Sequence, residues 1–329
     1  MPWFDRPLAE LREYRTGTQE PPDLDQWWQA RLKAARAAAA PPQVTPYLPD
    51  VYGEMTAFDV QFSGAGGDRI RAWYLRPRAA CSTDLPLVVR FVGYGGGRGL
   101  PADHSLLPAT GLAVFVMDVR GQGGRWTIGV TGDAGSGPEY SAVMTRGIAD
   151  PEEYYFTRLY VDAVRAVETV REMTGVDATR IAVSGSSQGG GLALAAAALL
   201  GQAVRVCHAD VPFLCDIGHA VTLSARMPYA EVAEFLAQQV DLVPAALDTL
   251  RYVDCALLAR RITASCLLSV GLMDEICPPS TVFGAYNEIT APKDIAVFPF
   301  GVHAVPPAHL ERQLRHLREL LLAGLATAS

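Results

Sequence analysis

Residues 180–200 of the chain read RIAVSGSSQGGGLALAAAALL, and this stretch decides the fold. It begins as a short β-branched strand and ends as an alanine- and leucine-rich helix, with Ser186 and Ser187 between them. A sharp turn from strand into helix leaves its middle residue strained, and it needs small residues two positions before and after. Gly185 and Gly189 hold those positions around Ser187, which predicts a nucleophilic hydroxyl at the start of a helix.

A second interpretation of this stretch is that Ser186 or Ser187 only caps the helix, because helix starts often carry serine. Ser186 is the weaker nucleophile candidate, since it lacks glycines at the required offsets. The strand before Ser187 and the helix after it favour the nucleophile. Its oxygen would lie where the helix dipole and free N–H groups stabilise developing negative charge.

Outward from this turn, apolar runs typical of strands alternate with segments typical of helices. The predicted strands cover residues 55–62, 69–76, 85–93, 111–121, 180–184, 204–211, 266–271 and 294–300. The predicted helices cover residues 27–40, 101–110, 151–173, 191–200, 228–261 and 308–325. The first two strands alternate apolar and polar residues around a Gly-Ala-Gly-Gly turn, which predicts an antiparallel hairpin. The later strands are continuously apolar, which predicts a parallel sheet covered on both faces. Together they predict an α/β-hydrolase fold, with a mostly parallel central sheet and helices on both faces.

We expect one domain over residues 1–329, because no linker-like composition divides the chain. Residues 1–45 form a predicted N-terminal helical extension, in which Asp25 is expected to cap the helix and Pro41-Pro42 to stop it. Asp150 is expected to cap the long helix before residue 173. Residues 216–262 form a predicted helical insertion, which covers the site or makes a subunit contact.

Composition excludes several classes of function. The net charge is −7 and no lysine- or arginine-rich block is present, so nucleic acid is not an expected partner. The N-terminus does not resemble a signal peptide, and the longest apolar run, 189–200, is shorter than the about 20 residues that span a bilayer. We therefore expect a cytoplasmic protein without membrane contact. Scattered cysteines without short pair spacings predict buried free thiols and no zinc site: Cys81, Cys207, Cys215, Cys255, Cys266 and Cys277.

A serine nucleophile needs a base, and the base needs a carboxylate that orients it. In the α/β-hydrolase fold the chain order is serine, acid, histidine, each at the carboxyl end of a strand. Asp274 lies three residues beyond the strand ending near Gly271, and His303 follows the last predicted strand. Glu275 is an alternative acid, but Asp274 is closer to the strand. Other candidates lie at the wrong strand ends, too early in the chain or on the last helix: Asp254, Asp294, His208, His219, His309 and His316.

The oxyanion donors are predicted to be backbone N–H groups. The first is that of Gln188, directly after the nucleophile, and the second is that of Tyr94 in the loop FVGYGGGRG at 91–99. Glycines in this loop let the backbone approach a ligand closely. The loop lacks the lysine and threonine of a P-loop, and no Rossmann unit surrounds it, so a nucleotide cofactor is not expected.

With these pieces placed, residues 50–305 resemble the acetyl xylan esterase / cephalosporin C deacetylase family, carbohydrate esterase family 7. The stretches that carry the resemblance are GLAVFVMDVRGQGG at 111–124, GSSQGG at 185–190, HADVPFLCD at 208–216 and SVGLMDEICPPSTVFGAYNEI at 269–289. The resemblance implies a cytoplasmic serine esterase that deacetylates short acetylated sugars, including xylo-oligosaccharides, and cephalosporin C. It also implies homo-hexamers with inward-facing sites and, in many members, formation of peracetic acid from hydrogen peroxide.

The family motifs carry over to this chain residue by residue. They imply a Ser187, Asp274 and His303 triad, and an oxyanion hole from the N–H groups of Tyr94 and Gln188. The Arg120-Gly121-Gln122 motif is implied to be structural, and neither a metal nor a cofactor is implied. One departure is His303-Ala304, where the family usually has His-Glu. We expect the chemistry to survive, because the glutamate is not a triad member.

Acyl transfer from a small acetylated substrate is the predicted reaction, and bulky side chains near Tyr94 and Pro212 are expected to wall a small acyl pocket. Two kinds of alternative remain open. One is a general carboxylesterase or a peptidase of the same fold. The other is a catalytically inactive scaffold, which the His-Ala change favours slightly and the complete triad disfavours.

Overall fold

The computed structural model describes residues 3–80, 84–133 and 143–322. Its centre is a nine-stranded sheet in the order β1-β2-β3-β5-β4-β6-β7-β8-β9. The strands are β1 Gln43–Tyr47, β2 Met55–Ser63, β3 Arg69–Pro77, β4 Leu85–Phe91, β5 Ala113–Met117, β6 Val176–Ser186, β7 Val206–Asp210, β8 Ser265–Gly271 and β9 Lys293–Phe298. The pairs from β1 to β5 are antiparallel and the pairs from β5 through β4 to β9 are parallel. The predicted fold class and its N-terminal hairpin are confirmed.

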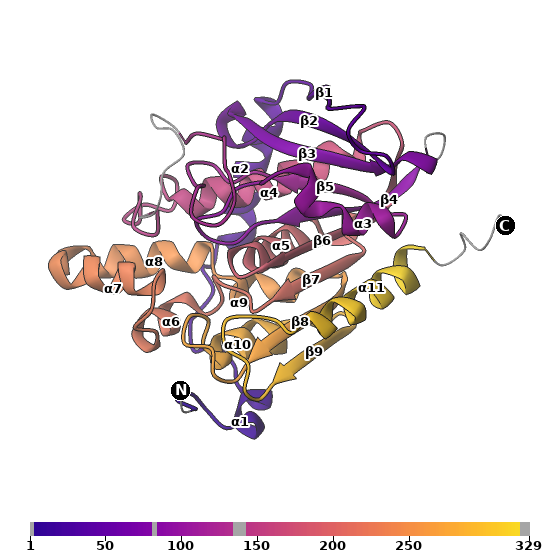
Figure 1. Ribbon diagram of the computed structural model, residues 1–329. Coiled ribbons are helices and arrows are strands. Elements are labelled where there is room, and N and C mark those ends of the chain that lie inside the picture. The colour runs from indigo at the N-terminus through magenta and orange to yellow at the C-terminus, as the bar shows by residue number, and fades with distance from the viewer. Residues whose placement is uncertain (1–2, 81–83, 134–142, 323–329) are drawn as a thin grey trace.

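Helices cover both faces of this sheet (Figure 1). On one face lie α4 Tyr155–Arg171 and α5 Gln188–Leu200, and on the other lie α3 Leu106–Ala109 and α11 Pro307–Leu321. Alternate strand residues point to opposite faces, so each strand serves two cores. In β4, for example, Val89 belongs to the larger core under α4 and α5, and Val88 to the smaller core with Leu317 of α11.

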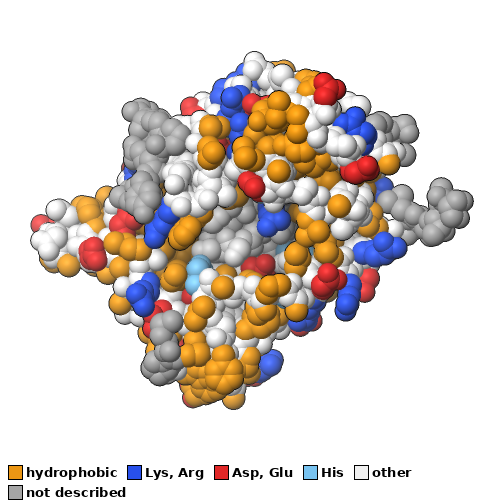
Figure 2. Space-filling model, in the orientation of Figure 1, with side chains coloured by type: hydrophobic (Ala, Val, Ile, Leu, Met, Phe, Trp, Pro, Cys, Tyr) orange, Lys and Arg blue, Asp and Glu red, His pale blue; other side chains and the backbone are white. Residues whose placement is uncertain are grey.

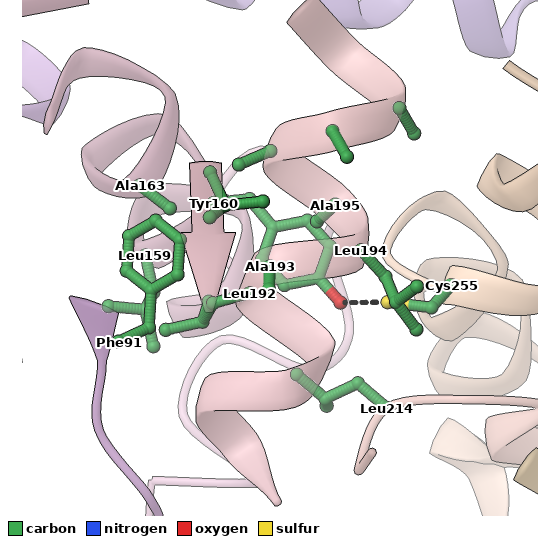
Figure 3. Close-up of a cluster of buried hydrophobic side chains, with 14 of the residues drawn as sticks. Phe91, Leu159, Tyr160, Ala163, Leu192, Ala193, Leu194, Ala195, Leu214 and Cys255 are labelled. Carbon is green, nitrogen blue, oxygen red and sulfur yellow. Dashed lines mark hydrogen bonds between the residues drawn. The ribbon is translucent and has the colours of Figure 1, made fainter. Parts of the chain in front are cut away.

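The larger core depends on the small residues of α5. Alanines such as Ala193 and Ala195 let this helix approach the sheet and α4 closely, and they are fully buried (Figure 3). Tyr160 of α4 lies across this contact, and its hydroxyl is 3.1 Å from the Cys255 sulfur (Figure 3). The Tyr160 hydroxyl also donates to the Val253 carbonyl at 2.8 Å, so this buried polar group has a hydrogen-bond partner.

Several predicted boundaries differ from the structure. Strand β5 ends at Met117, because the backbone then turns into the 118–124 loop, where Gly121, Gly123 and Gly124 have positive φ. Helix α4 begins at Tyr155, with Tyr154 rather than Asp150 at its N-cap. Helix α2, Leu24–Ala37, follows Asp23 at its N-cap, so Asp25 lies inside the helix.

Three elements have no counterpart in the sequence prediction: α1 Leu8–Glu13, α10 Pro279–Glu288 and β1. Strand β1 is an edge strand whose residues are mostly exposed, and it contains Pro46. Edge strands tolerate proline and lack an apolar face, so the usual alternation is missing. Residues 43–45 of the predicted N-terminal extension therefore belong to the sheet.

The predicted insertion at 216–262 contains four helices, α6 Ile217–Leu223, α7 Tyr229–Gln238, α8 Val243–Tyr252 and α9 Cys255–Leu258. Helices α7 and α8 extend away from the sheet beyond the carboxyl ends of its parallel strands (Figure 1). Among the described residues, no helix is both long and apolar enough to cross a membrane.

Five cysteines in the described residues are buried free thiols: Cys207, Cys215, Cys255, Cys266 and Cys277. Cys81 lies outside the described residues. The described part of the chain contains no cluster of three His, Cys, Asp or Glu side chains that could hold a metal ion.

Candidate active site

The turn at Ser187 has the geometry that the sequence predicts. Ser187 has φ 56° and ψ −121°, in a region that residues with a Cβ rarely adopt, and it lies between β6 and α5. A Cβ on Gly185 would lie 2.3 Å from the Gly189 carbonyl carbon, and one on Gly189 would lie 2.3 Å from the Phe91 carbonyl oxygen. The backbone N–H of Ser187 donates to the Asp210 carbonyl at 2.9 Å, which ties the turn to β7.

Three side chains from separate strand ends meet at this turn. The Ser187 hydroxyl is 2.9 Å from His303 Nε2, and His303 Nδ1 is 2.8 Å from Asp274 Oδ2. An ionised Asp274 carboxylate can accept a hydrogen bond but cannot donate one. Nδ1 of His303 therefore carries the ring proton, and Nε2 accepts from the Ser187 hydroxyl. Asp274 is fully buried, and its Oδ1 accepts from the backbone N–H groups of Ile276 at 2.8 Å and Cys277 at 3.0 Å. This arrangement can deprotonate the serine oxygen during attack on a carbonyl.

The structure places the alternative acids elsewhere. Glu275 pairs with Arg226 at 2.8 Å, and Asp294 pairs with Arg312. Asp254 is buried and accepts from the Ile217 N–H at 2.7 Å. Burial raises the pKa of Asp254 to about 7, with a further contribution from the nearby Asp216 carboxylate.

The other candidate histidines have partners of their own. His208 lies 2.9 Å from His316, His309 lies 3.1 Å from Asp210, and His219 lies 3.1 Å from the Ser280 hydroxyl. Ser186 lines the same cavity as Ser187, but the hydroxyl that lies 2.9 Å from His303 Nε2 is that of Ser187. Of the two serines and the five histidines weighed in the sequence, the structure brings Ser187 and His303 together.

The loop after β4 brings Tyr94 to the cavity of Ser187, and Gln188 follows Ser187 directly in the chain. Tyr94 is the second residue of a turn that Gly96 closes by donating to the Gly93 carbonyl at 3.0 Å. Gln188 is the first residue of α5, so its N–H has no carbonyl one helical turn earlier. Gly93 and Tyr94 line one cavity with Ser187 and His303.

Gln122, which the resemblance places in a structural motif, holds this loop through contacts that the sequence does not predict. Gln122 Oε1 accepts from the Gly95 N–H at 2.7 Å, while its Nε2 donates to Gln188 Oε1 at 2.8 Å and to the Tyr155 hydroxyl at 2.9 Å. Gln122 is almost fully buried. The residue beside the nucleophile and the oxyanion loop thus share one glutamine, 66 positions before Gln188 in the chain. No local pattern signals that contact.

Arg120, two residues before Gln122, fixes this segment through ion pairs. Its buried guanidinium makes two bonds to Asp162 at 2.5 and 2.8 Å, and contacts Asp68 at 2.9 Å and Asp133 at 3.1 Å. Burial opposes its charge, but the interactions with Asp162 and the other carboxylates raise the pKa of Arg120 above its ordinary value. Gly121 has φ 63°, and a Cβ there would lie 2.9 Å from Asp133 Cβ. Arg120, Gly121 and Gln122 therefore each have a distinct structural contact.

The cavity above Ser187 has a volume of about 330 Å³. Besides the residues named above, its walls include Arg125, Trp126, Met227, Pro228 and Ile276. Figure 2 shows a central hollow in one face of the molecule, with a histidine at its edge. Of the two positions near which bulky wall side chains are predicted, Tyr94 lines the cavity, whereas Pro212 itself packs near Gly190, where an added Cβ would lie 3.1 Å from the Pro212 Cα. The turn after β7 directs it toward α5, so it is not among the residues that line the cavity.

The fold and the Ser-His-Asp geometry define a serine hydrolase of the α/β-hydrolase class. Structures of acylaminoacyl peptidase and dipeptidyl peptidase 4, below 20% identity to this chain, share the fold alone.

The family follows from a match over nearly the whole chain. The model of the acetyl xylan esterase family (AXE1) matches residues 1–320, and the chain belongs to that family. The acetyl xylan esterase structure from Paenibacillus sp. R4 is 34% identical, covers 96% of this chain and 100% of its own, and superposes with a TM-score of 0.89. Acetyl Xylan Esterase 1 from Thermoanaerobacterium sp. is also 34% identical, over 96% of this chain and 99% of its own, with a TM-score of 0.86.

A curated relative extends beyond the length of this chain. Acetyl esterase Axe7A of Xylanibacter ruminicola is 28% identical over 291 residues, which are 87% of this chain and 64% of that protein. The chain thus spans less than two thirds of this relative. The family predicted from the sequence motifs is confirmed.

Proposed function

We propose that the protein is a serine esterase that removes acetyl groups from small acetylated substrates such as xylo-oligosaccharides. One observation carries this proposal: the Ser187–His303–Asp274 chain, with contacts of 2.9 and 2.8 Å, opens into a cavity of about 330 Å³. That size suits a short acyl group with part of its alcohol. The acetyl esterase names of the relatives support the choice of acyl group.

The proposed reaction has two halves. Ser187 Oγ attacks the acetyl carbonyl carbon as its proton moves to His303 Nε2, and Asp274 stabilises the imidazolium. The N–H groups of Gln188 and Tyr94 stabilise the oxyanion. His303 then gives the proton to the departing sugar oxygen, which leaves an acetyl ester on Ser187. Water, deprotonated by His303, attacks that ester and releases acetate, and the proton returns to Ser187.

Two finer activities belong to the same proposal. Cephalosporin C would supply another acetyl ester to the same nucleophile. Hydrogen peroxide in place of water would convert the acetyl-enzyme into peracetic acid and free serine. The hexamer and the cytoplasmic location implied by the resemblance also stay predictions.

The replacement of the usual glutamate by Ala304 is compatible with this chemistry. Ala304 is exposed, and its backbone N–H donates to the Val302 carbonyl at 2.7 Å. Ala304 takes no part in the hydrogen bonds that join Ser187, His303 and Asp274.

The test compares a panel of esters on the wild type and on Ser187→Ala. We expect p-nitrophenyl acetate to be hydrolysed faster than the butyrate and much faster than the octanoate, and acetylated xylo-oligosaccharides to release acetate. A fluorophosphonate probe should label Ser187, and Ser187→Ala should lose both labelling and at least about 10⁴-fold in kcat. Equal rates across the acyl series would contradict the acetyl preference, and an unlabelled wild type would favour the scaffold.

A further inference from the structure

Glu231 joins the helical insertion to the loop that carries Tyr94. It lies in the first turn of α7, and its carboxylate is half-buried. Its Oε2 accepts from the Tyr94 hydroxyl at 3.1 Å, and its Oε1 accepts from the backbone N–H groups of Met144 at 2.9 Å and Thr145 at 3.3 Å. One carboxylate thus connects α7, the loop after β4 and the segment before α4.

Tyr94 is held at both ends by these contacts. Its phenol oxygen also accepts from the Val143 N–H at 3.1 Å, and its ring meets Phe213 edge-on, with the centroids 6.4 Å apart. Its main-chain carbonyl accepts from the Trp126 indole N–H at 3.1 Å. The phenol contacts thus link the loop that carries Tyr94 to Glu231.

The same helix positions a wall of the cavity. Met227 and Pro228 line it and directly precede α7, while Tyr94 lines it from the oxyanion loop. The hydrogen bond between Glu231 and Tyr94 therefore connects the wall formed before α7 to the wall formed by the loop after β4. Burial raises the pKa of Glu231, and the hydrogen bonds from Tyr94, Met144 and Thr145 oppose that rise.

We propose that Glu231 is a positioning residue: through Tyr94 it fixes the oxyanion loop relative to Ser187, and through α7 it sets the width of the acyl cavity. The proposal rests on the esterase function above. It assigns the insertion a part in selecting short acyl groups. A displacement of about 1 Å at a reacting group can reduce turnover about 100-fold, so a lost anchor should appear in kcat.

Four single variants and the double variant Glu231→Ala with Tyr94→Phe test this assignment. Glu231→Ala removes both acceptor oxygens and with them all three hydrogen bonds, Glu231→Gln keeps an oxygen for the backbone donors, and Tyr94→Phe removes only the hydroxyl. Glu234→Ala, on an exposed position of the same helix, is the matched control. For each, kcat and KM are measured with p-nitrophenyl acetate and butyrate, per active site counted from the p-nitrophenolate burst with diethyl p-nitrophenyl phosphate.

We expect Glu231→Ala to lower kcat for the acetate about 10- to 100-fold with KM within about threefold, and to lower the acetate-to-butyrate ratio of kcat/KM about fivefold. Glu231→Gln should regain most of both, and Glu231→Ala with Tyr94→Phe should be no worse than Glu231→Ala alone. The proposal is overturned if kcat per titrated site and the ester ratio stay within twofold of wild type. It is also overturned if Glu234→Ala loses as much, or if the two changes add. A wild type that neither hydrolyses the acetate nor titrates would instead refute the esterase function.

Discussion

The Asp274 carboxylate is fixed by the backbone that follows it. The N–H groups of Ile276 and Cys277 both donate to Oδ1, which leaves Oδ2 to face His303. The neighbouring Glu275 turns outward to Arg226 instead. Two adjacent acids thus have different environments, and only one of them can orient the imidazole.

This difference predicts that Asp274→Asn lowers kcat about 10³- to 10⁴-fold with little change in KM, because an amide presents the wrong hydrogen-bonding pattern to the His303 ring. Glu275→Gln should stay within about threefold of wild type. Steady-state kinetics with p-nitrophenyl acetate measures both. A larger loss in Glu275→Gln than in Asp274→Asn would reverse the assignment of the acid.

Strand β7 and helix α11 are joined by a line of polar side chains. His208 of β7 is almost fully buried, and its Nε2 lies 2.9 Å from Nδ1 of His316. The other ring nitrogen of His316, Nε2, lies 3.1 Å from the Ser265 hydroxyl. At the end of β7, Gln313 donates to Asp210 at 2.9 Å. Because the Asp210 carbonyl accepts from Ser187, this line stabilises the strand that supports the nucleophile.

The buried His208 predicts a pH effect on stability. Burial, aided by the charge of His316, lowers the pKa of His208 to about 3. Below the unfolded pKa of about 6.5 the unfolded chain takes up a proton that the folded chain refuses, so stability falls with falling pH. Between pH 7 and pH 5 we expect the wild type to lose about 1–2 kcal/mol more free energy of unfolding than His208→Gln. Urea unfolding at both pH values measures this difference, and parallel losses would contradict it.

Across the whole molecule, the N-terminal segment is tied to the base of the insertion. The buried Asp216 accepts from the Tyr14 hydroxyl and from the Thr16 hydroxyl, both at 2.7 Å. Helix α2 packs on α4, with the Trp28 and Tyr160 rings stacked at 5.8 Å. The extension is therefore part of the folded protein, and its residues Tyr14 and Thr16 lie close to the start of α6.

Asp216→Asn should loosen this attachment. Asparagine tolerates the left-handed backbone of Asp216, φ 45°, but offers one acceptor oxygen where the Tyr14, Thr16 and Thr18 hydroxyls donate to two. We expect limited trypsin digestion to cut after Arg15 several times faster than in wild type. Asp25→Asn, which removes a partner of Arg261 at the surface, is the control and should leave the rate unchanged. Equal rates for all three proteins would show that other contacts hold the segment.

The sheet and the meeting of Ser187, Asp274 and His303 could be predicted because local patterns and chain order encode them. Continuous apolar runs mark β4 to β8, and glycines at fixed offsets mark Ser187. Contacts between distant segments were not predictable in this way. The Gln122–Gln188 bond and the Glu231–Tyr94 bond each join residues whose closeness only the folded chain creates. The cavity walls at Trp126 and Met227 belong to the same group, since loops without periodicity supply them.

The reaction rate of the buried cysteine thiols reports how often the fold opens. Cys207, Cys215, Cys255, Cys266 and Cys277 are at most 1% exposed. A thiol reagent in water can reach them only when the surrounding layers separate. In a Cys81→Ser variant, the rate at which Ellman's reagent reacts with the other five thiols would measure the rate of these openings. The buried core would be unchanged.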